Sequence, residues 1–171
     1  ISETIDSGLA RRVPFHYEMA AGHDDEDPRP ADRNSRDEWP GKLAVKGILR
    51  ADDAVRAVEY GADAVIVSNH GGRQLDSAPS GIAALPAVAA AVGRRVPVLM
   101  DGGIRRGSDV VKARALGATA CIIGRAGLYG LASGGQTGVE RAIAMLQQEI
   151  DLTLALLGVP DIANVDRSAL A

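Results

Sequence analysis

The sequence predicts an α/β fold, in which a parallel sheet packs against helices, and three observations support this fold class. Short apolar runs alternate with helix-forming segments four times between residues 42 and 171. The runs are continuously apolar, as is typical of parallel strands covered on both faces. A polar, glycine-bearing motif comes at the end of each run, so these motifs are expected to gather at the carboxyl edge of one sheet.

The elements can be assigned in order along the chain. The expected strands are 43–45, ending at Lys46-Gly47, then 64–67, 96–100 and 120–123. Asp52 and Asp53 can start a helix that Gly61 ends. An alanine-rich apolar helix is expected over 82–92, and Ser108 can cap a helix that Gly117 ends.

The segment from Tyr129 to Thr137 is small and polar and predicts a loop. We expect Tyr129, like the single tryptophan Trp39, to be a packing residue. A last helix is expected after Gly138. Its apolar residues fall near one stripe, namely Val139, Ile143, Leu146, Ile150 and Leu157.

Composition limits the class of protein. The chain has 171 residues, 46% of them hydrophobic, which is enough for one domain with a core. A net charge of −3 argues against a nucleic-acid surface. The single cysteine, Cys121, excludes an intrachain disulfide and favours a reducing, cytoplasmic compartment. No apolar stretch is long enough for a membrane span, the N-terminus does not resemble a signal peptide, and we assign no metal ligands.

Two regions are expected. Residues 1–41 read as a polar loop or linker, partly disordered, because residues 21–39 are crowded with charged residues, proline and asparagine. Residues 42–171 provide about four β/α units, the C-terminal half of a (β/α)8 TIM barrel. An isolated half leaves apolar sheet edges unpaired at 43–45 and 120–123. We therefore expect another segment, another chain or self-association to cover them.

The motif over residues 68–76, Ser-Asn-His-Gly-Gly-Arg-Gln-Leu-Asp, follows an apolar strand directly. Histidine readily moves protons near neutral pH, and arginine binds a carboxylate through two parallel hydrogen bonds. His70 is therefore a candidate general base and Arg73 a candidate anchor for a substrate carboxylate. The ordinary alternatives are a structural histidine and a surface ion pair.

Two glycine-bearing turns follow the last two strands, at residues 101–107 and at Gly124-Arg125. Exposed backbone N–H groups and the start of a helix favour an anion, so together the turns suggest a phosphate site. Arg106 is expected to point to solvent. Lys46 ends the first strand, where it could form a Schiff base, an ion pair at the barrel rim or a contact with a cofactor.

These motifs resemble those of the FMN-dependent α-hydroxy acid dehydrogenases and oxidases, a family that includes lactate dehydrogenase, glycolate oxidase and mandelate dehydrogenase. The resemblance rests on Lys46-Gly47-Ile48, on the histidine motif 68–76, on 101–107 and on Gly124-Arg125, and it covers about residues 37–171. Residues 36–40 and 157–162 look most like the mandelate dehydrogenase branch.

The resemblance implies a (β/α)8 barrel that binds FMN at the carboxyl edge. It implies that Lys46 contacts the flavin, Ser68 the flavin or ribityl side, and Asp101 the ribityl hydroxyls. His70 would be the general base and Arg73 would bind the substrate carboxylate. The cofactor phosphate would lie against the two glycine turns, with contacts from Gly102, Gly103, Ile104, Arg105, Gly124 and Arg125.

The leading hypothesis is FMN-dependent oxidation of an (S)-2-hydroxy acid to the 2-oxo acid, in a homo-oligomeric assembly completed by an N-terminal half-barrel. Residues 1–41 do not align with the first four strands of the family barrel. One alternative is therefore a non-catalytic half-barrel that binds a phosphorylated ligand or assembles with itself. A different phosphate-binding barrel enzyme, such as an isomerase with FMN or a sugar-phosphate lyase, is a third hypothesis.

Overall fold

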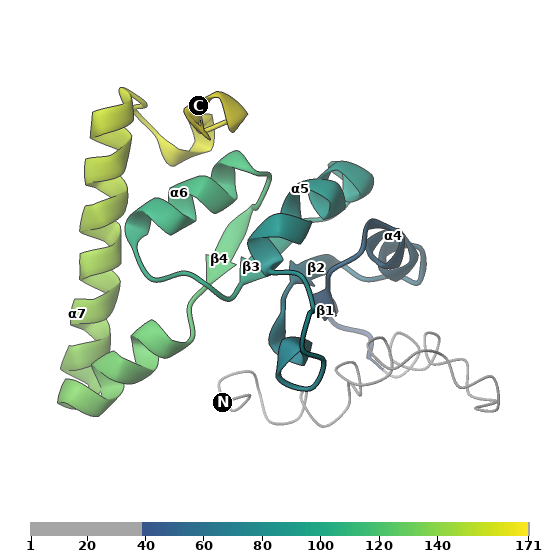
Figure 1. Cartoon of the computed structure of the whole chain (residues 1–171), viewed down its shortest axis with the longest axis horizontal. Helices are drawn as coiled ribbons and strands as arrows, with labels where there is room; N and C mark the ends of the chain where they lie inside the picture. Colours follow the sequence, from purple (N-terminus) through teal and green to yellow (C-terminus); the bar gives the residue numbers. More distant parts are fainter. Residues whose placement is uncertain (1–38, 171) are drawn as a thin grey trace.

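The computed structural model describes residues 39–170, which form a four-stranded sheet with helices packed against it (Figure 1). The predicted linker over 1–41 falls almost entirely outside these residues. The regular elements, in chain order, are β1 (Ala44–Ile48), α4 (Ala51–Glu59), β2 (Ala64–Val67), the 3-10 turn η1 (His70–Arg73), α5 (Gly81–Val92), β3 (Val98–Asp101), α6 (Gly107–Ala115), β4 (Ala120–Ile122), α7 (Arg125–Leu157), η2 (Ile162–Asn164) and η3 (Arg167–Leu170).

The predicted parallel sheet is confirmed. Its strands pair in sequence order, β1-β2-β3-β4, and each neighbouring pair is parallel. One register line runs across the sheet through Lys46, Ile66, Leu99 and Ala120. Within residues 39–170, β1 and β4 are edge strands with one neighbour each, as the sequence predicts.

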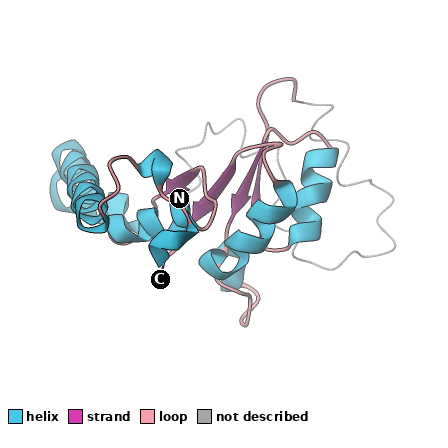
Figure 2. Ribbon diagram, turned by 90° about the horizontal axis from the view of Figure 1, so that it is seen from above, coloured by secondary structure: helices cyan, strands magenta, loops and turns pink. Residues whose placement is uncertain are grey.

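The helices lie on one face of this sheet, which differs from the expectation that both faces are covered (Figure 2). Helices α4, α5 and α6 connect successive strands and contact the sheet. Because crossovers between parallel strands are right-handed, a strand order that always steps in one direction puts every connecting helix on the same side. This is the topology of a barrel wall, whose second face points to the barrel interior.

The main core lies between the sheet and these helices. It contains the strand residues that point toward the helices, including Val45, Val65, Val67 and Met100, together with Leu85 and Val88 of α5. A smaller cluster joins α6, α7 and the C-terminal turns through Val111, Leu154 and Val165. The alternating side of each strand faces away from the helices, and that side carries Lys46 and Asp101.

The prediction of a loop over 129–137 is wrong for most of this segment, because the residues on both sides of Gly134 and Gly135 are helical and belong to α7. The helix breaks at Gly134 and Gly135, and its two legs touch through Gly130 and Gly138. A Cβ at Gly130 would lie 2.5 Å from the carbonyl oxygen of Gly138, so the small residues serve a close helix contact.

Of the two expected packing residues, Tyr129 is 66% exposed and does not pack in a core. Trp39 agrees with the expectation, since it is half-buried, lies against Gly41 and donates its indole N–H to the carbonyl oxygen of Lys42. Of the predicted stripe on the last helix, Ile143 and Leu157 are exposed, and Leu154 is the buried residue of α7. Among residues 39–170, no helix is both long and apolar enough to cross a bilayer.

Candidate active site

The candidate residues come from the carboxyl ends of the strands. Since all four strands are parallel, the segments that follow them leave the sheet at one edge (Figure 1). Ser68 follows β2, Asp101 ends β3, and Gly124 precedes α7 directly after β4. Lys46 lies inside β1 rather than at its end, because the strand continues to Ile48.

A polar cluster joins three of these strands. The Nζ atom of Lys46 lies 2.7 Å from Oδ2 of Asp101 and donates a hydrogen bond of 3.0 Å to Oγ of Ser68. The backbone N–H of His70 donates to the same hydroxyl at 3.2 Å. Ser68 is buried, whereas the side chains of Lys46 and Asp101 each remain 20% exposed. The cluster therefore ties the start of the histidine motif to β1 and β3.

The sheet register explains this contact. Lys46 and Leu99 lie on one register line with Ile66 between them, and Asp101 is two residues beyond Leu99 on the same side of β3. Side chains two apart on a strand point to the same face. The Lys46 side chain therefore crosses β2 on the helix-free face to meet Asp101, and of the three readings of Lys46 the ion pair is observed.

His70 and Arg73 begin and end the single turn η1, and both are exposed. The turn is fastened at its start by the Ser68 hydroxyl. Farther along, the Asn69 side chain donates its Nδ2 to the carbonyl oxygen of Ala78 at 3.3 Å. The base and the carboxylate anchor that the sequence predicts thus share one short, pinned segment above the sheet edge.

The first glycine turn is open where a ligand would approach. Gly102 and Gly103 have φ angles of +79° and +81°, which favour glycine, and a Cβ built on either would meet no atom of residues 39–170 within 4 Å. The position of Gly124 is equally open, and Arg125 is exposed at the first residue of α7. Ile104 packs in the main core, so it can offer a ligand only its backbone.

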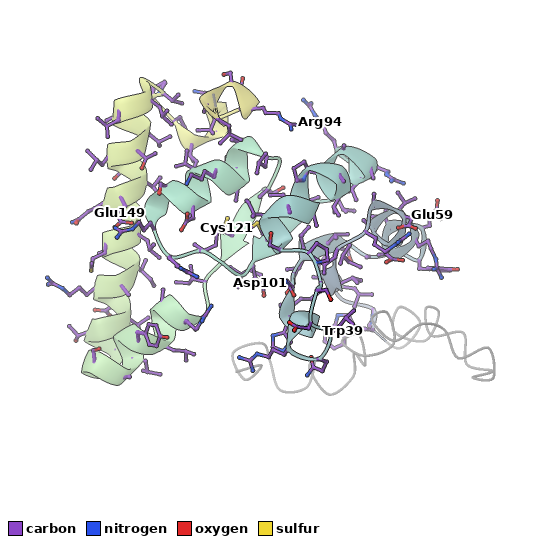
Figure 3. All side chains as sticks on the ribbon, viewed as in Figure 1. Trp39, Glu59, Arg94, Asp101, Cys121 and Glu149 are labelled. Carbon is purple, nitrogen blue, oxygen red and sulfur yellow. The ribbon has the colours of Figure 1, made fainter. Side chains whose placement is uncertain are left out.

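The start of α6 does not supply the free N–H groups that the sequence predicts. The N–H groups of Arg105 and Arg106 both donate to Oδ2 of Asp109 at 3.0 Å. The N–H of Gly107 donates to Oε2 of Glu149 at 2.7 Å, and Figure 3 shows Glu149 reaching from α7 toward this helix end. Two carboxylates of the chain therefore already accept the hydrogen bonds from the start of α6. An external anion can bind only at the glycine turns.

The helix start itself also differs from the prediction. Ser108 does not cap α6, which begins at Gly107 after an extended Arg106. Asp109, in the first helical turn, binds the preceding N–H groups instead, and an acidic residue in a first turn is a sequence signal that could have identified it. Arg106 is exposed, as expected, with Nη1 lying 3.5 Å from Glu149. Glu149 lies 42 residues after Gly107 in the sequence, and no local sequence pattern predicts their hydrogen bond.

Cys121 has no place in the site. It lies in β4, packed against the main core, and burial raises the pKa of its thiol to about 11. A thiol that keeps its proton at neutral pH is a poor nucleophile. Cys121 therefore packs here as a small hydrophobic residue.

Known proteins are similar to this chain over a range that includes these candidate residues. The FMN-dependent dehydrogenase family matches residues 29–171. The L-lactate oxidase of Nostoc sp. is 56% identical over 131 residues, which are 77% of this chain and 36% of the oxidase. The (S)-mandelate dehydrogenase of Pseudomonas putida is 56% identical over 76% of this chain and 33% of that enzyme. A pre-mycofactocin synthase of Mycobacterium tuberculosis is 57% identical over 77% of this chain and 34% of that protein.

Solved structures agree in fold. A soluble mutant of the membrane-associated (S)-mandelate dehydrogenase from Pseudomonas putida is 53% identical, with a TM-score of 0.76 over 81% of this chain and 39% of that one. Another structure describes (S)-mandelate dehydrogenase as a monotopic membrane protein, with a TM-score of 0.77, 54% identity, and coverage of 81% of this chain and 37% of that one.

The chain spans about a third of the length of the curated relatives it matches. The four β/α units correspond to part of the barrel of these hydroxy acid oxidases and dehydrogenases, so the predicted partial TIM barrel is confirmed. Together with the match over most of its residues, this similarity shows that the chain belongs to the FMN-dependent dehydrogenase family.

Proposed function

We propose that this chain forms the FMN-phosphate-binding half of an enzyme that oxidises an (S)-2-hydroxy acid to the 2-oxo acid, completed by the N-terminal half of the barrel. The observation that carries the proposal is the Lys46–Ser68–Asp101 cluster, which joins β1, the residue after β2 and the end of β3. Its Ser68 hydroxyl also holds the start of the turn that bears His70 and Arg73. A carboxylate anchor and a proton acceptor three residues apart suit a substrate that offers both a carboxylate and a hydroxyl.

The residues present fit FMN. The open backbone at Gly102, Gly103 and Gly124 leaves space that any side chain would fill, and its N–H groups with Arg125 suit a phosphate. Arg105 is exposed and can add a second guanidinium to that site. Lys46, Ser68 and Asp101 present an ammonium, a hydroxyl and a carboxylate, which suit the polar ring edge and the ribityl hydroxyls.

When bound, FMN would accept the two electrons and one of the two protons that the alcohol loses, which leaves the other proton for His70. Arg73 holds the substrate carboxylate in its planar fork and so fixes the α-carbon and its hydroxyl relative to His70. His70 accepts a proton from the substrate, a role that suits imidazole near neutral pH. Lys46 and Asp101 form an ion pair at the same site.

The test is substrate-dependent flavin reduction by the purified native assembly, measured with lactate and mandelate. We expect His70→Ala to retain FMN and to slow reduction by at least ~10²-fold, the lower range for a general base. Arg73→Lys should weaken substrate binding, because a point charge cannot replace the planar fork.

Arg94→Lys is the matched control, since Arg94 is exposed and precedes β3 at the opposite edge of the sheet. Unchanged reduction in His70→Ala would remove His70 from the mechanism. A colourless protein that rejects FMN, even with the missing half supplied, would refute the proposal as a whole.

A second candidate is a non-catalytic half-barrel that binds a phosphorylated ligand or pairs with itself. Within residues 39–170, β1 and β4 each have one strand neighbour, and these open edges favour it. Sedimentation that finds a stable symmetric dimer without flavin turnover would support this candidate over the enzyme. The complete His70 and Arg73 pair counts against it, because phosphate binding alone does not need these residues.

We also propose a cytoplasmic location and a homo-oligomeric assembly for the complete enzyme. Fractionation of cells into membrane and supernatant tests the location, and a membrane fraction that retains the protein would contradict it. The comparison with a monotopic relative makes this measurement informative.

A further inference from the structure

Asn69 belongs to the histidine motif but has no role in the proposed reaction. It lies between Ser68, which is part of the polar cluster, and His70. Its Nδ2 donates to the carbonyl oxygen of Ala78, nine residues later. This hydrogen bond joins the two ends of the segment that contains both His70 and Arg73, so one side chain closes the loop of the candidate active site.

The same side chain lies against Gly72. A Cβ built at Gly72 would overlap Oδ1 of Asn69 and would lie 2.9 Å from its Cγ. Gly72 is not among the glycines with positive φ, so its backbone would accept alanine without strain. The absence of a side chain at position 72 therefore makes room for the Asn69 amide.

The burial of this amide is an independent observation. Oδ1 of Asn69 is buried, and within residues 39–170 it has no hydrogen-bond partner. A buried acceptor without a partner is unfavourable, since its hydration is lost without compensation. This unfavourable burial implies that the side chain stabilises the protein in another way. Its contacts with Ala78 and Gly72 indicate that it keeps the segment around η1 ordered.

We propose that Asn69 is a positioning residue, which clamps the segment carrying His70 and Arg73, and that Gly72 is required because of it. The inference concerns the order of residues 69–78, and its catalytic consequence rests on the proposed function. The amide holds the two ends of the loop together through its hydrogen bond to Ala78, and it packs against Gly72 within the loop. His70 and Arg73 are thereby held at a constant separation, on the segment whose start is bound by the Ser68 hydroxyl.

The test is a double-mutant cycle on the full 171-residue chain, using Asn69→Ala, Gly72→Ala and the double variant, read by amide hydrogen exchange. The reporters are the N–H groups of Gln74 and Leu75, which both donate to the carbonyl oxygen of Gly71. We expect each single variant to speed their exchange about tenfold, the factor to which the loss of one net hydrogen bond corresponds.

The double variant should exchange no faster than Asn69→Ala, because alanine at 69 removes the oxygen with which a Cβ at 72 collides. Additive effects, or wild-type exchange in Asn69→Ala, would overturn the inference. Gly134→Ala is the control for a glycine substitution, since a Cβ there meets nothing within 4 Å. Asn69→Asp keeps the shape and loses the donor, and it should reproduce the faster exchange if Asn69→Ala fails to fold.

A second readout connects the clamp to catalysis in the assembled holoenzyme. Asn69→Asp should raise KM for the 2-hydroxy acid and lower kcat, with FMN affinity unchanged, because the clamp contacts neither the glycine turns nor Lys46. A loss of FMN affinity in parallel with activity would indicate a general structural defect and would contradict a positioning role. If wild-type protein shows no flavin-dependent turnover, the proposed function fails, while the exchange cycle still decides the clamp.

Discussion

The ion pair between Lys46 and Asp101 provides the sharpest test of the site geometry. At 2.7 Å, two unit charges attract by about 6 kcal/mol if the effective dielectric constant is ~20. Lost hydration offsets much of this. Exposed pairs contribute about 0–1 kcal/mol net, and breaking a buried pair costs about 3–5 kcal/mol. With 20% of each side chain exposed, we expect an intermediate coupling of about 2 kcal/mol.

The measurement is a double-mutant cycle of Lys46→Met and Asp101→Asn, with free energies of unfolding from urea titration of the chain. Each single variant and the double variant should lose about 2 kcal/mol, so that the single losses do not add. The control cycle uses Lys42 and Asp63, whose charged atoms are also 2.7 Å apart but whose lysine is 91% exposed.

The control pair should couple by less than about 1 kcal/mol, since solvent screens an exposed lysine. Equal couplings for the two pairs would refute the reasoning, because burial is the main difference between them. A Lys46–Asp101 coupling near zero would show that the contact does not persist in solution.

Two further predictions concern the surroundings of the site. Gly107→Ala should destabilise the chain by about 1–3 kcal/mol in urea titration, because its Cβ would lie 2.6 Å from the backbone carbon of Glu149; full stability would argue against the close α6–α7 contact. The Cys121 thiol should react slowly with iodoacetamide at pH 8 and rapidly in urea. Since folding raises its pKa from 9.0 to about 11, its contribution to stability should be complete below pH 9 and should fall between pH 9 and 11, and Cys121→Ala should abolish that fall.

The strands and their order of appearance could be predicted because apolar runs bounded by glycine leave few alternatives. The strand 64–67 was placed residue by residue, and the others shifted by one to three residues at an end. The helical start of α7 could not be predicted, because its many small residues resemble a loop when the sequence is read alone. Only the contact of Gly130 with Gly138 explains their presence.

The candidate site was predictable where it depends on strand ends and unpredictable where it depends on distant partners. Parallel strands bring Lys46, Ser68 and Asp101 to one edge, but the choice of an ion pair for Lys46 needs the register of three strands. The occupation of the α6 start by Glu149 joins residues 42 positions apart. Sequence motifs therefore indicate the candidate residues, and the register decides which of their side chains meet.

The topology of the sheet connects the site to the completion of the barrel. Lys46 and Asp101 project from the helix-free face, the same face on which Leu99 and Ile122 are only half-buried. Any segment that completes the barrel covers that face and removes water from around the ion pair. Because charges attract more strongly where water is excluded, the Lys46–Asp101 coupling should rise above its value in the isolated chain. Repeating the cycle in the assembled enzyme measures this difference, and an unchanged coupling would mean that the completing segment leaves the pair hydrated.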